Sequence, residues 1–325
     1  MPVPNRKNLG KVDAAMNMSS ISDLITRLEK RDWRALSRAI SIVENNYEGK
    51  EKLQNYAYQA AKEDCLVIGI TGAGGAGKST LIDSILEIYS KEGKRVGVLA
   101  VDPSSSYTGG AVLGDRIRMG SHTMEKGIFI RSFGSRGSLG GISQGAKDAL
   151  YLYKSFGFDV IIVESYGVGQ AETDITNYVD VTTVVVAPGN GDYIQLAKAG
   201  TQEIADIFVT NKADNPEAEA LYLQMDATLS VFPENQRPVL VKTIARDHKG
   251  ADELVEAFRT TGEKLRKNRN TKKRLRITDE ILSGAMCDFN PHLRKAAEAM
   301  AEQVFEGELT PYEAARKLGA RLSIT

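Results

Sequence analysis

The sequence has little of the chemistry that builds disulfide frameworks or structural zinc sites. Its 325 residues include only two cysteines, Cys65 and Cys287, and three histidines, and no C-x-x-C motif occurs. Scarce cysteine and scattered histidine argue against both a disulfide scaffold and a bound structural zinc ion. We interpret Cys65, which opens an apolar run, as a small buried hydrophobe.

An excess of charge of one sign and long apolar runs are missing as well. Lys and Arg number 42 and Asp and Glu number 42, so the formal net charge is zero. A neutral chain has no overall attraction to nucleic acid or to an anionic membrane. There is no apolar run of membrane-spanning length, and residues 1–7 lack the apolar core of a signal peptide. We therefore expect a cytoplasmic protein that binds neither membrane nor nucleic acid.

One stretch, residues 72–80, fits the phosphate-binding pattern G-x-x-x-x-G-K-[ST]. An apolar run before it, 66–70, predicts a strand, and the residues after it predict a helix. Glycines let backbone N–H groups turn toward an anion, and the helix N-terminus adds positive potential. We expect Lys78 to reach the β- and γ-phosphates and Ser79 to bind Mg²⁺. The predicted nucleotide-binding residues here are Gly72, Gly74, Gly75, Ala76, Gly77, Lys78, Ser79 and Thr80.

Short β-branched runs recur along the chain and alternate with helical patterns. This is typical of a mostly parallel sheet that is buried on both faces, so we predict an α/β fold of the P-loop NTPase type, with helices flanking a central sheet. Ligands in such sheets bind at the carboxyl ends of the strands. The predicted strands are 66–70, 95–101, 128–130, 158–163, 181–186, 207–210 and 239–241.

Helical periodicity dominates both ends of the chain. We predict an N-terminal arm and helical subdomain over 1–62, a P-loop nucleotide-binding domain over 63–260, and a C-terminal helical arm over 261–325. A terminal helical unit beside a complete domain suggests an interface for self-association, so we expect 261–325 to be a dimerisation arm. Trp33 is interpreted as core packing rather than as a ligand site.

Two further features mark the C-terminal region. Thr310 precedes Pro311 and stands three residues before Glu313, which predicts a capped helix start. A basic run over 264–276 has no interleaved aromatic residues, so we interpret it as a solvated face rather than a nucleic-acid site.

The residues after the predicted strand 207–210 indicate guanine recognition. Asn211, Lys212 and Asp214 fit the N-K-x-D pattern. The carboxylate of Asp214 can accept both the N1–H and N2–H donors of guanine, whereas adenine would leave it buried and unpaired. The stem of Lys212 is expected to cover one face of the base. Thr243, Ile244 and Ala245 end the next strand and are expected to form an accessory base-side loop.

Acidic residues at other strand ends indicate a magnesium site and conformational switches. Glu164 ends a predicted core strand, and Gly167 follows three residues later, where its N–H can meet a γ-phosphate. Asp102 and Asp115 border a loop rich in glycine and serine that we predict to act as a switch. We assign Lys78, Asp102, Asp115, Glu164 and Gly167 to catalysis, and Ser79, Asp102, Asp115 and Glu164 to Mg²⁺.

Several stretches together resemble the MeaB/ArgK family of P-loop GTPases, which belongs to the SIMIBI class. They are 101–105, 113–119, 136–141, 167–170, 203–206 and 211–214. The resemblance implies a GTP-binding and hydrolysing metallochaperone that gates adenosylcobalamin loading and protects or reactivates a cobalamin-dependent acyl-CoA mutase. It implies GTP/GDP and Mg²⁺ as ligands, a homodimer formed through the C-terminal arm, and a partner-sensing switch with Gln195 and Lys198 at its functional positions.

The chain departs from that family at partner-facing loops, including Ser138, Ser165-Tyr166 and Tyr193-Ile194. A mutase acting on an acyl-CoA other than methylmalonyl-CoA is therefore a hypothesis. Two other functions stay open. One is a SIMIBI GTPase that inserts metal into another enzyme, which predicts Cys or His ligands near the switches. The other is an ArgK-type kinase that phosphorylates a transport protein, which would not need guanine specificity.

Overall fold

Seven apolar runs become the strands of one parallel sheet in the computed structural model. The structure describes residues 18–102, 127–134, 142–165, 175–189, 205–265, 273–274, 276–278, 280–281 and 291–322. The strands are β1 (Leu66–Thr71), β2 (Val96–Asp102), β3 (Ile128–Gly134), β4 (Val160–Ser165), β5 (Val181–Val186), β6 (Ile207–Thr210) and β7 (Val239–Lys242). Their order is β3-β2-β4-β1-β5-β6-β7, and each neighbouring pair is parallel. The predicted parallel α/β sheet is confirmed.

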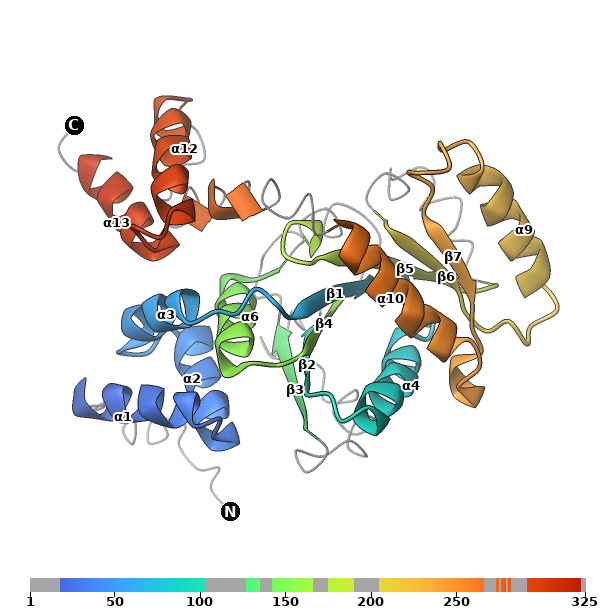
Figure 1. Ribbon diagram of the computed structural model, residues 1–325, viewed down its shortest axis with the longest axis horizontal. Coiled ribbons are helices and arrows are strands. Elements are labelled where there is room, and N and C mark those ends of the chain that lie inside the picture. Colours follow the sequence, from blue (N-terminus) through green and yellow to red (C-terminus); the bar gives the residue numbers. More distant parts are fainter. Residues whose placement is uncertain are drawn as a thin grey trace, which may run out of the picture.

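Helices precede, connect and follow these strands. They are α1 (Met18–Glu29), α2 (Trp33–Asn45), α3 (Lys50–Gln59), α4 (Lys78–Lys91), α6 (Gln144–Phe156), α9 (Ala218–Leu229), the 3₁₀ helix η5 (Ala245–Asp247), α10 (Ala251–Leu265), α12 (Pro291–Phe305) and α13 (Pro311–Leu322). In Figure 1, α4 and α10 lie on one side of the sheet, and α6 with α2 and α3 lies on the other. Within the described ranges, every helix is too short or too polar to cross a bilayer.

The alternation of side chains along the strands divides the core between the two faces. On β1, Val67 joins the core under α2 and α6, while Ile68 and Ile70 join the core under α4 and α10. On β5, Val184 packs beneath α9 and Val185 packs with α4. Because both faces are covered, the strands need no polar face, and this explains their continuous apolar sequences.

The helices α1–α3 share one hydrophobic core with α6 and the sheet. Trp33, at the start of α2, stacks 6.0 Å from Phe129 on β3 and lies 4.9 Å from Phe156 and 5.8 Å from Phe158, measured between ring centroids. Aromatic pairs at these separations stabilise packing beyond the area that they bury. Trp33 is partly buried and packs against this core, which confirms its interpretation as a packing residue. Cys65 is buried, as predicted.

Aspartates directly before three strands fix the amino-terminal edge of the sheet. Asp159, Asp180 and Asp206 precede β4, β5 and β6. Each accepts a backbone N–H at the start of a neighbouring strand: Arg95 N at 2.7 Å, Val67 N at 2.9 Å and Thr182 N at 2.8 Å, respectively. These bonds satisfy donors that the sheet ladder leaves unpaired. At the opposite edge, where the strands end, lie the loops that carry the sequence motifs.

The C-terminal helices α12 and α13 share a small apolar core with Ile277 and Ile281, and Tyr58 of α3 packs against it. The start of α13 is a capping box, as predicted: Glu313 N donates to Thr310 Oγ1 at 3.2 Å, and Thr310 N donates to Glu313 Oε2 at 2.8 Å. From α13, the Tyr312 hydroxyl donates to Asp148 Oδ1 at 2.9 Å. Asp148 lies on α6 and is 1% exposed, and this burial raises its pKa, although the charge of Lys50 acts in the opposite direction.

The basic run over 264–276 is not a uniformly solvated face, so that interpretation was wrong for its last residue. Arg276 is 8% exposed and lies 4.0 Å from Glu280, and its guanidinium lies over the ring of Tyr151. Lys273 pairs with Glu63 at 3.1 Å. A buried cation must be paired to offset its lost hydration. Glu280 lies four residues from Arg276, whereas Tyr151 and Glu63 come from segments distant in sequence.

Candidate nucleotide site

The glycine-rich loop joins the end of β1 to the start of α4, as its spelling predicts. Two glycines are required by close approaches. A Cβ on Gly72 would lie 2.2 Å from the Val185 carbonyl oxygen, and one on Gly77 would lie 2.4 Å from Asn211 Nδ2. Gly72, Gly75 and Gly77 have φ values of 142°, 76° and 90°, which favour glycine. The sequence pattern is thus explained by backbone conformation and by contacts with β5 and Asn211.

Lys78 folds back over this loop. Its side chain is buried, and its Nζ donates to the carbonyl oxygens of Gly72 at 2.7 Å and Ala73 at 3.0 Å. These bonds hold a positive charge in the concavity of the loop, at the amino-terminal end of α4. An anion bound there would meet the ammonium group, the loop N–H groups and the helix terminus together.

The end of β4 lies beside the same helix. The Ser79 hydroxyl donates to Glu164 Oε1 at 2.9 Å. The pair follows from topology, because β4 is hydrogen-bonded to β1 and Ile70 is in register with Glu164. A hydroxyl and a carboxylate are oxygen donors of the kind that Mg²⁺ prefers, and Mg²⁺ retains several waters when few protein ligands are present. The donor set therefore fits that ion.

Asn211 links the phosphate loop to the base-side loops. It is 2% exposed, and its Nδ2 donates to the Ala76 carbonyl oxygen at 2.9 Å. Its Oδ1 accepts the Thr243 hydroxyl at 3.0 Å and the Ala245 N–H at 3.1 Å. One amide thereby joins three loops that are remote in sequence, at the carboxyl edge of the sheet. Thr243 serves this link and does not line the pocket.

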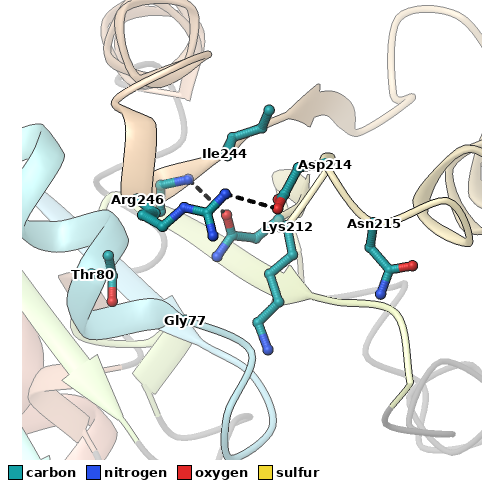
Figure 2. A pocket seen from close by; sticks show the side chains of 9 residues that line it. Gly77, Thr80, Lys212, Asp214, Asn215, Ile244 and Arg246 are labelled. Carbon is teal, nitrogen blue, oxygen red and sulfur yellow. Dashed lines mark hydrogen bonds and ion pairs between the residues drawn. The ribbon is translucent and has the colours of Figure 1, made fainter.

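A pocket of about 270 Å³ lies between these loops. In Figure 2, the Lys212 side chain extends along one wall, and Arg246 reaches across to Asp214 from the opposite side. Arg246 Nη2 donates to Asp214 Oδ2 at 3.1 Å. The lining residues are Gly77, Thr80, Asn211, Lys212, Asp214, Asn215, Ile244, Ala245 and Arg246.

Two of the lining residues, Asn215 and Arg246, were missed by the sequence interpretation. Arg246 directly follows the predicted loop 243–245, so its position in the sequence was the one available signal. Its hydrogen bond to Asp247, together with the charge of Asp214, raises the pKa of its guanidinium. The pocket therefore carries a permanent positive charge beside the carboxylate that is expected to read the base.

Not every predicted residue can be placed. Asp102 ends β2 at the carboxyl edge of the sheet, as expected, but its side chain is not described. The predictions for Asp115, Gly167, Gln195 and Lys198 fall outside the described residues. The structure thus brings together the phosphate loop, Glu164 and the base-side residues, and it leaves the predicted switches untested.

Comparison with known proteins identifies the family. Residues 36–297 match the family described as "Methylmalonyl Co-A mutase-associated GTPase MeaB". The chain belongs to the MeaB family. It is accordingly a GTPase, a hydrolase that acts on GTP, and the predicted resemblance is confirmed.

Individual relatives agree with this assignment. A Pyrococcus abyssi protein named as a GTPase is 41% identical over 307 residues, which cover 91% of this chain and 94% of that protein. The mouse "Methylmalonic aciduria type A homolog, mitochondrial" is 30% identical over 323 residues, covering 91% of this chain and 78% of the relative. A crystal structure described as an LAO/AO transport system kinase aligns with a TM-score of 0.64 at 24% identity, over 95% of this chain and 99% of the other, which supports the fold of this MeaB-family GTPase.

Proposed function

We propose that GTP binds across the two loop systems that Asn211 joins, with its phosphates at Lys78 and its base beside Asp214. The observation that carries this proposal is the hydrogen bonding of one buried amide to Ala76 in the phosphate loop and to Ala245 in the base-side loop. In this arrangement Lys78 leaves its carbonyl partners to contact the β- and γ-phosphates. Asp214 accepts guanine N–H donors, and the stem of Lys212 covers the base.

Ser79 and Glu164 are the proposed holders of Mg²⁺, with Asp102 and Asp115 completing the acidic set. When bound, the ion neutralises charge on the β- and γ-phosphate oxygens. Glu164 keeps the Ser79 hydroxyl oriented at the start of α4, and the Gly167 N–H is the proposed sensor of the γ-phosphate. Loss of that phosphate on hydrolysis then releases the segment that carries Gly167.

The proposed cellular role is that of a GTP-dependent chaperone for an adenosylcobalamin-dependent acyl-CoA mutase. The family description, which names association with methylmalonyl-CoA mutase, supports this role. Gln195 and Lys198 are the proposed partner-sensing residues, and residues 261–325 are the proposed dimerisation arm. The altered residues Ser138 and Tyr193 favour testing mutases that act on other acyl-CoA substrates as well.

The experiment is GTP turnover by the purified protein, alone and with each cobalamin-dependent mutase encoded in the same genome. Lys78→Ala measures turnover that does not depend on the site. Acceleration by one mutase, absent with Lys78→Ala, is the expected result. Slow turnover that no mutase accelerates would contradict the chaperone role. Transfer of phosphate to an added transport protein would favour the kinase alternative, and GTP-dependent metal insertion into another enzyme would favour the metal-insertion alternative.

A further inference from the structure

Arg246 joins the base-reading carboxylate to a second carboxylate. Its Nη2 donates to Asp214 Oδ2 at 3.1 Å, and its Nε donates to Asp247 Oδ1 at 3.1 Å. Figure 2 shows the Arg246 side chain crossing the pocket toward Asp214, on the side opposite Lys212. Because the guanidinium is planar and its Nε is bonded to Asp247, its Nη2 presents an N–H to the Asp214 carboxylate from a defined direction.

The backbone from which Arg246 projects is itself anchored. The preceding residue, Ala245, donates its N–H to Asn211 Oδ1 at 3.1 Å, and its carbonyl oxygen accepts the Ser84 hydroxyl at 2.8 Å. Ile244 and Lys249 close the turn with backbone hydrogen bonds of 3.0 and 3.3 Å. Arg246 therefore starts from a point that is fixed relative to α4 and to the base-side loop.

We propose that Arg246 is a positioning residue for purine selection, which holds the Asp214 carboxylate in the orientation that meets guanine. This inference rests on the proposed base site. An ionised carboxylate has about four lone-pair sites, so one bond from Arg246 leaves acceptors for both guanine N–H donors. Without Arg246, rotation of the carboxylate has to be frozen when the base binds, which costs affinity.

The change in solvation on base binding explains why Arg246 should favour base binding rather than compete with the base for Asp214. The side chains of Arg246 and Asp214 are 73% and 41% exposed, so in the open pocket their attraction is screened and weak. A base that enters the pocket displaces water from this pair, and the lower local dielectric strengthens the same hydrogen bond. The interaction thus stabilises the bound state more than the empty one.

The test measures dissociation constants for GDP, IDP and ADP with the full-length protein. IDP lacks the 2-amino group and ADP lacks both guanine donors. We expect Arg246→Ala to weaken GDP binding about five-fold, as loss of a modest ion pair does, to weaken IDP binding less, and to leave ADP binding unchanged. Arg246→Lys keeps the charge without the planar fork, so its effect should lie between wild type and Arg246→Ala.

Two further variants separate positioning from general packing. Arg259→Ala removes an arginine of α10 that is ion-paired with Glu92, away from the pocket, and it should leave the ratio of GDP to ADP affinity unchanged. In an Asp214→Ala background, Arg246→Ala should cause no further loss of GDP affinity, because its effect acts through the carboxylate.

Each other outcome has a defined meaning. Tighter GDP binding by Arg246→Ala would show that the arginine competes with guanine and would overturn the inference. Equal losses for GDP and ADP, a loss that persists with Asp214→Ala, or no change at all would also overturn it. If wild type did not favour GDP over ADP, or if Asp214→Ala left GDP affinity unchanged, the proposed base site itself would fail.

Discussion

Replacing Asn211 by alanine is expected to weaken both the fold and the nucleotide site, because this amide connects the two. The change removes a donor to the Ala76 carbonyl oxygen and an acceptor for the Thr243 hydroxyl and the Ala245 N–H. Asn211 and Thr243 are 2% and 1% exposed, so water has little access to the groups left behind. The loops would separate or keep unsatisfied polar atoms.

The magnitude follows from the number of bonds. Three hydrogen bonds at about 1 kcal/mol each give a loss of about 3 kcal/mol, and unsatisfied buried groups increase it. If the loss is shared evenly between folding and binding, the GDP dissociation constant should rise about ten-fold. Thr243→Val removes one bond and should lower the free energy of unfolding by about 1 kcal/mol. Asn211→Asp keeps the acceptor for Thr243 and Ala245 but places an oxygen against the Ala76 carbonyl oxygen. The substitution should therefore disturb the phosphate loop more than the base-side loop.

The assay combines urea unfolding without nucleotide and calorimetric titration with GDP, on wild type and the three variants. From tightest to weakest GDP binding, the expected order is wild type, Thr243→Val and then Asn211→Ala. Should Asn211→Ala lower the urea midpoint while GDP affinity stays at the wild-type value, Asn211 would be a structural residue only, and the coupling of the loops would be refuted.

Three other perturbations test separate parts of the structure. Lys78→Ala should lower GTP affinity at least ten-fold with an unchanged circular dichroism spectrum, as titration with a fluorescent GTP analogue would show; unaltered binding would contradict the placement of the phosphates. Trp33→Ala should reduce the free energy of unfolding by about 3 kcal/mol, the low end of the range for Trp→Ala, because the side chain is partly buried and its removal leaves a cavity beside three phenylalanines; urea unfolding checks this. Partial desolvation raises the pKa of the Glu63 carboxyl, but the charges of Lys154 and Lys273 outweigh it and lower the pKa to about 2. Since this folded-state pKa lies below the unfolded value, Glu63 contributes stability above pH 4.5 that is lost as pH falls toward 2; unfolding midpoints across that range should fall less steeply for Glu63→Gln, and parallel curves would rule the contribution out.

The strands could be predicted from the sequence because their apolar, β-branched composition reflects the buried environment in which they lie. The predicted runs 181–186 and 207–210 match β5 and β6 residue for residue, and the other strands differ by a few residues at their ends. A continuous β-branched run is typical of strands that are buried on both faces, so it predicts a parallel sheet without reference to distant segments. Thr310 and Glu313 were likewise predictable, since a capping box involves one short segment.

The sequence by itself determined the sheet, the phosphate loop and the base motif, because each depends on residue types at fixed spacing. Only the tertiary structure decided what surrounds them. Nothing near Asp148 in the sequence shows that Gln54 and Tyr312 bury it, and nothing near Arg276 indicates Tyr151. The position of Arg246 beside Asp214 also depends on the tertiary structure, because β6 and β7 pair in parallel and end at the same edge of the sheet. Such contacts join segments far apart in the chain, and the free energy of burying a charge depends on which partners those segments supply.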